Sequence, residues 1–480
     1  MKLFSKKPKK PLTANERLGK LKFTDLAGEQ DESVAQHLLV QKPVNDEKTK
    51  DLTDCITPPR ERRVQKIKFR TLASDRPNKA VALNKEFEKA QLTLRTVFSP
   101  SSPVLDINYF AGRVKETTRA VSALENERMH LIIHGKRGLG KTSFSNTLCG
   151  IAREAGYIVC NTASSQHSTY SEIFRAFLKE IPLLYDQNFV TDHGVDTRLE
   201  GFDTLLPEGD FSPKELTKIL LRLATTRVLF IIDEFDRNQS PDFKDAIIET
   251  IKNFSDGCVR ASLIVIGATD TVDELIGVNE SVRRNITGIP IKVFNDTESG
   301  ELFDIGEEAS NVVFPPHIRA EISNLSRNIP HSMRLLCLHS AQAALIQERW
   351  TITDKDMAQA ISLSIMDAQA LLDVDLLEIT HSKKSNQFEA FLYSLASSEC
   401  NENSEFYAEQ AAQAHRKQNN EVVTALSIGS RMAMLCKTTP PILTKREHQH
   451  KVLYKFSDPT FGFYLRLMHS YGRILAQKEA

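Results

Sequence analysis

The chain has 480 residues, of which 41% are hydrophobic and 7% aromatic, a composition typical of a folded globular protein and not of a disordered one. Its 62 basic and 62 acidic residues cancel, which excludes a chain-wide electrostatic attraction for nucleic acid or membrane. At this length a division into about two to four domains is expected.

The seven cysteines are scattered and include no C-x-x-C pair. This pattern is typical of reduced thiols in a cytoplasmic protein and argues against a zinc site or a disulfide framework. The opening "MKLFSKKPKKP" is basic but lacks the apolar core of a secretory signal. No run approaches the roughly 18 apolar residues that a membrane-spanning helix needs. We therefore expect a cytoplasmic protein with no membrane partner.

The first part of the chain is basic and lacks a regular apolar pattern. Residues 1–100 hold 22 Lys and Arg against 13 Asp and Glu. Turn-prone pieces such as "TPPRERR" interrupt residues 1–80, so we expect this region to be poorly ordered or dependent on a protein effector. Residues 81–103 are expected to form a helix and a linker, because apolar residues recur at helical spacing from Leu83 to Val97, before "SPSSP".

Residues 104–297 alternate short apolar runs with amphipathic helices, the pattern of a parallel sheet covered by helices on both faces. Two of the helices have recognisable starts, since Thr169 with Glu172 and Ser212 with Glu215 have capping-box spacing. The expected strands are "HLIIHG", "GYIVCN", "RVLFIIDE", "SLIVIGAT" and "GIPIKVF". The sequence therefore predicts an α/β fold for this region.

The remainder of the chain is mainly helical. Residues 298–370 are expected to form consecutive helices without strands. Residues 371–480 contain helices near 385–397 and 421–436, two β-prone pieces around a charged turn, and a last helix from about Thr460. Helix, helix, hairpin is the order of a winged-helix module. Its wing would contact the phosphates of double-stranded DNA through Lys445, Arg446, His448, His450 and Lys451.

One glycine-rich segment carries the strongest signal in the chain. It lies between an apolar strand and a helix and satisfies the pattern G-x-x-x-x-G-K-[ST], which binds nucleotide phosphates through backbone N–H groups. Lys141 would reach the β and γ phosphates of ATP, and Thr142 would bind Mg²⁺. The residues expected to bind the nucleotide are Gly135, Lys136, Arg137, Gly138, Leu139, Gly140, Lys141, Thr142 and Ser143.

The run "VLFIIDEFD" supplies a second part of the site. Its apolar residues predict a central strand, and Asp233 follows at the C-terminal end, where open α/β sheets bind ligands. Asp233 would contact Mg²⁺, and Glu234 would polarise the attacking water, because nucleotide hydrolysis depends on positioning and charge stabilisation.

Further polar residues follow, each with two interpretations. Thr269 and Asp270 would sense the γ-phosphate or cap the next helix. Arg283 and Arg284 would neutralise the charge of the transition state in the site of a neighbouring subunit. Alternatively, they would be solvated surface residues. Arg334 would report the nucleotide state or lie with its guanidinium at a domain boundary.

These pieces in this order resemble the AAA+ superfamily, and more narrowly the branch of origin-recognition initiators and STAND signalling ATPases. The sequence is similar to a bacterial group of ATP-binding proteins in "FSPSSPV", "YFAGR", "GKRGLGKTS", "FIIDEFDR", "IGATDTVDELIGVNESVRR" and "IPHSMRLL". The resemblance covers about residues 98–366, implies that residues 298–366 are the AAA+ lid, and extends more weakly to "YKFSDPTFGFYLRL" in a winged-helix tail. We therefore expect a P-loop AAA+ sheet at 104–297, a helical lid at 298–370 and a winged-helix domain at 371–480. The resemblance also implies that Phe110, Gly112 and Arg113 form a loop over the adenine and phosphates.

The sequence departs from this pattern at two positions. Asp270 stands where initiator-type members often have Asn, and a carboxylate beside a γ-phosphate would slow hydrolysis. The lid lacks the usual Gly-x-Pro-Arg, and Arg334 lies later than the usual arginine.

Three functions are compatible with the pattern. The first is an ATP-hydrolysing regulatory ATPase whose nucleotide state controls conformation or homo-oligomerisation, with the winged helix as a DNA-contacting or inhibitory arm. The second is a STAND-like signalling switch in phage defence or a mobile element, which recruits an effector protein. The third is a nucleotide-dependent scaffold without turnover. Arg137, which the phosphate-binding pattern does not require, would face a neighbouring subunit.

Overall fold

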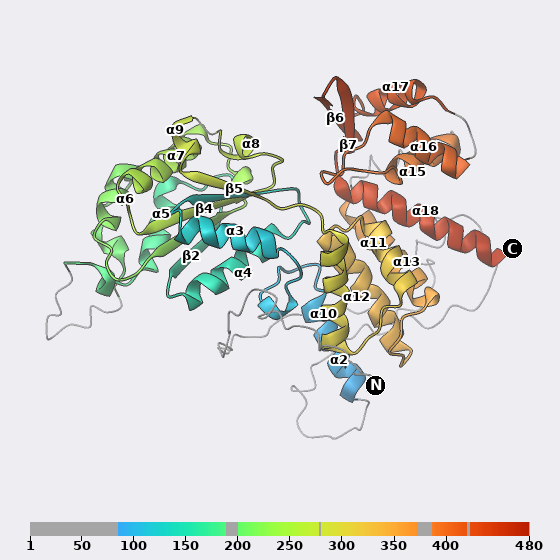
Figure 1. Cartoon of the computed structure of the whole chain (residues 1–480), viewed down its shortest axis with the longest axis horizontal. Coiled ribbons are helices and arrows are strands. Elements are labelled where there is room, and N and C mark those ends of the chain that lie inside the picture. Colours follow the sequence, from blue (N-terminus) through green and yellow to red (C-terminus); the bar gives the residue numbers. More distant parts are fainter. Residues whose placement is uncertain (1–84, 189–199, 278–279, 373–385, 420–422, 480) are drawn as a thin grey trace, which may run out of the picture. The chain divides into compact units, whose positions relative to one another are not determined.

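The computed structural model describes residues 85–188, 200–277, 280–372, 386–419 and 423–479 (Figure 1). The basic region 1–80 lies outside the described residues. The chain divides into two compact units, and the division falls within helices, for example between Gly306 and Glu307 and between Arg334 and Leu335. Among the described residues, the first unit contains 97–306 and 327–334, and the second contains 85–96, 307–326 and the chain from 335 onward.

A five-stranded sheet lies at the centre of the first unit, with the strand order β2-β3-β4-β1-β5. All four neighbouring pairs are parallel, which confirms the predicted parallel sheet. The strands are β1 (His130–His134), β2 (Ile158–Ala163), β3 (Val228–Asp233), β4 (Ala261–Gly267) and β5 (Ile286–Pro290). Because β3, β4 and β1 are adjacent, their C-terminal ends meet at one edge of the sheet.

Helices cover both faces of this sheet, as predicted (Figure 1). One layer contains α3 (Val114–Glu125) and α4 (Lys141–Glu154), and the other contains α5 (Tyr170–Lys179), α6 (Pro213–Leu220) and α7 (Pro241–Asp256). Both predicted capping boxes are present, at the starts of α5 and α6. The unit continues with α8 (Val272–Ile276), α9 (Glu280–Arg283) and the part of α10 (Asp296–Ser310) up to Gly306.

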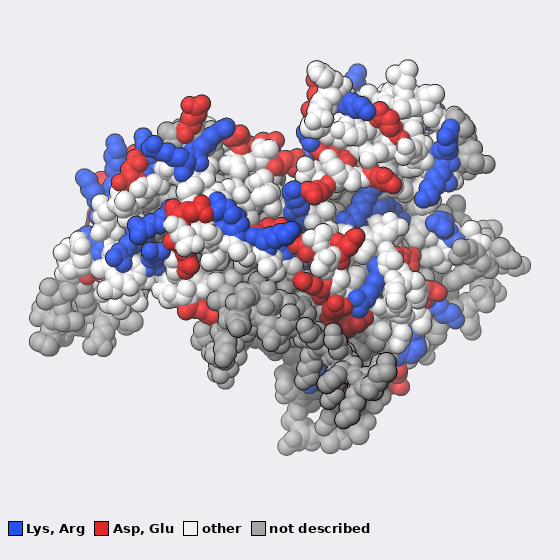
Figure 2. All heavy atoms as spheres, in the orientation of Figure 1, with Lys and Arg blue, Asp and Glu red and all other residues white. Residues whose placement is uncertain are grey.

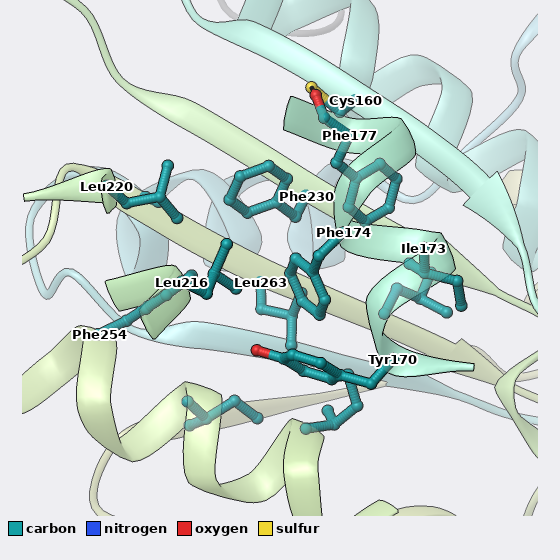
Figure 3. Close-up of a cluster of buried hydrophobic side chains, with 14 of the residues drawn as sticks. Cys160, Tyr170, Ile173, Phe174, Phe177, Leu216, Leu220, Phe230, Phe254 and Leu263 are labelled. Carbon is teal, nitrogen blue, oxygen red and sulfur yellow. Dashed lines mark hydrogen bonds between the residues drawn. The ribbon is translucent and has the colours of Figure 1, made fainter. Parts of the chain in front are cut away.

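The strands are buried on both sides, because alternate side chains of a strand point to opposite faces. In β3, Phe230 and Ile232 enter one core, whereas Leu229 and Ile231 enter the other. The first core is rich in aromatic rings, which converge on Phe230 from α5 and α7 (Figure 3). This burial fixes the position of the strand end that carries Asp233.

The second unit is helical apart from one hairpin. Its long helix α18 (Pro459–Glu479) packs against α11 (Pro316–Ser326), α13 (Asp354–Leu371) and α15 (Asn386–Ala396). The buried Arg466 of α18 donates a 2.7 Å hydrogen bond to the carbonyl of Leu325 near the end of α11. At another place Phe87 of α2 (Lys85–Val97) stacks on Trp350, with ring centroids 4.4 Å apart. The helix α12 (Pro330–Ile346) begins in the first unit and continues in the second.

The C-terminal part contains the predicted helices and hairpin, together with a helix that the sequence pattern did not reveal. After α15 come α16 (Ala408–Asn419) and α17 (Ala425–Leu435), then the antiparallel strands β6 (Leu443–His448) and β7 (Lys451–Phe456). The pattern missed α16 because few of its residues are apolar. Among the described residues, no helix combines the length and the apolar character needed to cross a membrane.

Candidate nucleotide-binding site

The glycine-rich segment joins β1 to α4 in a conformation that depends on its glycines. Gly135 has φ +146°, and a Cβ there would lie 2.2 Å from the carbonyl oxygen of Ile291. Gly138 and Gly140 also have positive φ values, which are unfavourable for other residues. The segment therefore passes closely beside the chain after β5 and delivers Lys141 at the first position of α4. The N–H groups at this helix start are suited to bind phosphate.

A cavity of about 650 Å³ opens at this edge of the sheet, and residues of the first unit line it. Twelve of the residues expected at the site line the cavity, and they come from parts of the chain far apart in sequence. They are Phe110, Arg113, Arg137, Gly138, Leu139, Gly140, Lys141, Thr142, Ser143, Asp233, Glu234 and Arg334. The structure thus brings together the glycine-rich segment, the end of β3 and the start of α12.

Thr142 and Asp233 are already in contact. The Thr142 hydroxyl donates a 2.8 Å hydrogen bond to Asp233 Oδ2, and Asp233 Oδ1 accepts one of 2.7 Å from the backbone N–H of Glu234. Hydroxyl and carboxylate oxygens are ligands that Mg²⁺ prefers. Their pairing across 91 residues of sequence fits an ion held between the helix start and the strand end.

The side chain of Lys141 contacts the backbone of the glycine-rich segment. Its ammonium group donates a 2.9 Å hydrogen bond to the carbonyl of Lys136. Burial lowers the pKa of Lys141 to about 8, although Asp233 and Asp236 act in the opposite direction and Arg137 adds to the lowering. A phosphate anion in the cavity would stabilise the charged form of this side chain.

Glu234 has two neighbours that the motif alone did not assign. Its backbone has φ +52°, and its carboxylate forms a 3.0 Å ion pair with Arg237, which also lines the cavity. Asp236 accepts a 2.8 Å hydrogen bond from the N–H of Ala268, just after β4. Asp236 therefore links the end of β3 to the end of β4, and Arg237 is an ion-pair partner of the Glu234 carboxylate. Both residues lie in "FIIDEFDR", so their closeness to Glu234 in sequence was the available signal.

The loop before α3 is fixed by two carboxylates of α10. The N–H groups of Gly112 and Arg113 donate 2.9 Å hydrogen bonds to Glu301 and Glu298 respectively. The Arg113 guanidinium contacts the carbonyls of Leu139 and Lys292. Burial lowers the pKa of Arg113, while Glu298 and Glu116 oppose the shift. Arg113 thus connects this loop to the glycine-rich segment, in addition to lining the cavity.

The other seven expected residues all belong to the described part of the chain but do not line the cavity. Gly135 and Lys136 shape the glycine-rich segment, and Gly112 packs on Glu298. The Thr269 hydroxyl donates to the carbonyl of Thr271. The remaining three are Asp270, Arg283 and Arg284.

The loop after β4 has the geometry of a helix cap. Thr271 accepts a hydrogen bond from the N–H of Glu274, and the N–H of Asp270 donates to the Glu274 side chain. Arg283 forms a 3.3 Å ion pair with Asp273, whereas Arg284 is exposed. For Thr269 and Asp270 this geometry favours capping over contact with the phosphate.

The start of α12 contributes a further part of the cavity wall. The buried Arg334 donates a 3.2 Å hydrogen bond to the carbonyl of Tyr109. The N–H of His331 donates a 3.1 Å hydrogen bond to the carbonyl of Gly138. Burial lowers the pKa of His331, and Arg334 adds to this effect. His331 was not expected at the site, because no local pattern marks a contact with Gly138.

The strand order, the helices on both faces and the phosphate-binding loop at the end of β1 define a P-loop AAA+ fold, followed by a helical C-terminal region. Residues 124–276 match the family model described as "AAA domain". This match contains β1 to β4, the glycine-rich segment, Asp233 and Glu234.

Several solved structures are similar to this chain. A Walker-type ATPase of Pyrococcus abyssi is 14% identical, with a TM-score of 0.47, and the match covers 77% of this chain and 99% of that one. The Orc1 protein of Aeropyrum pernix, solved in complex with DNA, is 14% identical, with a TM-score of 0.42 and coverages of 79% and 98%. The RuvB branch migration motor of Thermotoga maritima is 12% identical, with a TM-score of 0.36 and coverages of 73% and 94%. No curated protein gives a significant match.

Proposed function

We propose that this protein binds ATP with Mg²⁺, hydrolyses it, and uses its nucleotide state to control conformation or oligomerisation. The 2.8 Å hydrogen bond between Thr142 and Asp233 carries this proposal. It joins the phosphate-binding helix to the acidic strand end at the point where a nucleotide-bound ion would sit. A bound Mg²⁺ would neutralise charge on the phosphates, with Thr142 and Asp233 as its protein contacts.

The other side chains have separate tasks in this scheme. Lys141 would bind the β and γ phosphates after leaving its contact with the Lys136 carbonyl. Glu234 would orient the water that attacks the γ phosphate, once its carboxylate is free of Arg237. The ion pair with Arg237 favours slow hydrolysis, because the carboxylate must leave this partner before it can orient the water.

Steady-state Mg²⁺-dependent ATPase assays on the full chain test this proposal. We expect Glu234→Gln to lower kcat by at least about 100-fold while ATP still binds, since general-base catalysis is typically worth 10²–10⁴-fold. Lys141→Ala should abolish nucleotide binding. Asp245→Asn, at an exposed position of α7, is the control and should leave both values unchanged. Unaltered turnover in Glu234→Gln would instead support the nucleotide-dependent scaffold.

For the C-terminal helices and hairpin we propose a winged-helix module, with double-stranded DNA as one candidate partner. Two of its five expected wing cations are paired in the structure. Arg446 forms a 2.6 Å ion pair with Glu405, whose side chain is only 3% exposed, and Lys451 lies 3.4 Å from Glu409. Basic and acidic atoms are interspersed around the hairpin on the face shown in Figure 2. These pairings reduce the charge that the wing offers to phosphate.

The second candidate is a signalling switch that binds a protein partner, and α17 favours it. The side chains of Leu426 and Met434 on this helix are 83% and 63% exposed, which suits a protein contact better than a charged groove. In this alternative, residues 1–80 would recruit the effector.

Duplex-DNA affinity measured against salt concentration separates these partners. For the DNA partner, the logarithm of the association constant should fall with the logarithm of salt concentration with a slope of about −3 or shallower. Each neutralised phosphate contributes about −0.9 to this slope, and three of the five expected wing cations are outside the two ion pairs named above. No binding at low salt would favour the protein partner.

A further inference from the structure

A short segment outside the phosphate-binding pattern also borders the cavity. Residues 99–104, "SPSSPV", line it together with the glycine-rich segment. We refer to these six residues as the strap. Most of the strap lies in the linker predicted to follow the first helix, yet the structure places it in the same cavity wall as the glycine-rich segment.

Both ends of the strap are fixed. Phe98, which precedes it, is fully buried against Gly306, where an added Cβ would lie 2.1 Å from its ring. At the other end, the N–H of Val104 donates a 3.0 Å hydrogen bond to the Ser143 hydroxyl. Asn146 donates a longer bond of 3.4 Å to the Val104 carbonyl. Ser143 lies in the first turn of α4, so this end is held at the phosphate side of the cavity.

The middle of the strap is connected to the glycine-rich segment through His331. Both His331 and Pro100 line the cavity, and the Pro100 backbone opposes the lowering of the His331 pKa by burial. The His331 N–H in turn donates to the carbonyl of Gly138. Prolines at positions 100 and 103 also fix φ and limit the backbone freedom of the strap. The strap is thus a positioned part of the wall.

Three hydroxyl groups gather on this positioned backbone. Ser99 Oγ lies 2.7 Å from Ser102 Oγ and 3.3 Å from Ser101 Oγ. Ser101 and Ser102 are exposed, and Ser99 is half-buried. Each hydroxyl can donate one hydrogen and accept others. Bonds among the three hydroxyls leave donor and acceptor capacity that a ligand with its own hydroxyl groups can satisfy.

The cavity lining contains groups suited to different parts of a nucleotide. Its phosphate end is formed by residues 137–143, and Val104, Phe110 and Leu302 provide apolar lining. In a nucleoside triphosphate the ribose lies between the base and the phosphates. The strap runs from Ser99 to Val104, the residue that joins this apolar lining to the first turn of α4.

We propose that the strap recognises the ribose of the bound nucleotide, with Ser101 and Ser102 hydrogen-bonding its 2′ and 3′ hydroxyls. This inference rests on the proposed nucleotide binding and adds a sugar specificity to it. The site would then distinguish ribonucleotides from deoxyribonucleotides.

Calorimetric titrations of the full chain with ATP, 2′-deoxyATP, 3′-deoxyATP, GTP and inorganic triphosphate, all with Mg²⁺, test the inference. We expect the wild-type protein to bind ATP roughly 3- to 10-fold more tightly than either deoxynucleotide, the value of one neutral hydrogen bond. In the double variant Ser101→Ala/Ser102→Ala, this ratio should fall to about one, while triphosphate affinity stays unchanged. Ser122→Ala, a serine of α3 that is not among the cavity-lining residues, is the control and should keep the wild-type ratio.

The possible failures are distinguishable. Equal binding of ATP and both deoxynucleotides by the wild-type protein, or a ratio that persists in the double variant, overturns ribose recognition and leaves nucleotide binding intact. A double variant that loses discrimination between ATP and GTP, and not between ATP and the deoxynucleotides, shows recognition of the base and also overturns the proposal. Wild-type protein that binds neither ATP nor triphosphate overturns the proposed function itself.

Discussion

Lys141 shows how one residue links burial to ligand binding. In the free protein its charge is buried, and this burial lowers its pKa to about 8. Its ordinary value in the unfolded chain is about 10.4. The free protein therefore gains stability as the pH rises from 8 to about 10.4, since the unfolded chain binds more protons in that window. Bound phosphates would raise the folded-state pKa again.

The affinity for ATP should therefore fall above pH 8. The free protein loses the Lys141 proton there, whereas the complex retains it, so binding is accompanied by proton uptake. We expect negligible uptake from Lys141 at pH 7 and nearly one proton at pH 9.5. Calorimetry in two buffers of different ionisation enthalpy measures this quantity. Lys141→Arg, which stays charged throughout, should remove the dependence, and equal uptake in both proteins would rule out Lys141 as its source.

Residues of the site differ in how far the sequence could reveal them. Lys141, Thr142, Asp233 and Glu234 were predicted because each belongs to a short pattern whose chemistry is local. The contact of Arg113 with the Leu139 carbonyl spans 26 residues, and no spacing encodes it. The strap and His331 were missed as wall residues for the same reason, since their role depends on how distant segments meet.

At the scale of elements, the boundaries of α5 and α6 were encoded locally. Ser212 accepts from the N–H of Glu215 at 3.3 Å, and the Glu215 carboxylate accepts from the N–H of Ser212 at 2.8 Å. The bond from the Ser212 N–H to the carboxylate, and a second one donated by the Ser212 hydroxyl, lower the pKa of Glu215. By contrast, α16 lacks an apolar stripe and is buried mainly through Ala411 and His415. Its existence depends on tertiary packing that a sequence pattern does not show.

Removing the cap of α6 should loosen the first turn of this helix. We expect Ser212→Ala to cost about 1 kcal/mol of local stability, the usual value of an N-cap, visible as faster amide hydrogen exchange in α6. The loss should be smaller in a Glu215→Ala background, because the two side chains support each other. Ser240→Ala, which removes the simple cap of α7, should accelerate exchange in α7 and leave α6 unchanged. Equal exchange in α6 of Ser212→Ala and wild type would argue against the cap.

For the whole molecule, the question is whether ATP assembles several chains. Arg284 is exposed after α9, while the neighbouring Arg283 is engaged by Asp273. In the proposed assembly, Arg284 would reach the nucleotide of an adjacent subunit. It would stabilise transition-state charge there, as arginine fingers do.

Size-exclusion chromatography with ATP, ADP or no nucleotide tests this assembly. We expect a larger species with ATP alone, together with a specific ATPase activity that rises with protein concentration. Arg284→Ala should lower that activity by about 10³-fold or more while nucleotide affinity is preserved. Arg283→Ala should have a much smaller effect. A protein that stays monomeric with ATP, or two arginine variants with equal losses, would contradict a finger supplied by a neighbour.

The stacking of Phe87 on Trp350 gives the molecule an intrinsic optical reporter. Trp350 is the only tryptophan of the chain, and both rings belong to the second unit. The cavity, in contrast, is lined by residues of the first unit. Tryptophan emission therefore reports on the packing of α2 and not on direct contact with a nucleotide. A shift in that emission on adding ATP would show that nucleotide binding in the cavity changes the packing around Trp350 in the second unit. This measurement needs no attached fluorescent label.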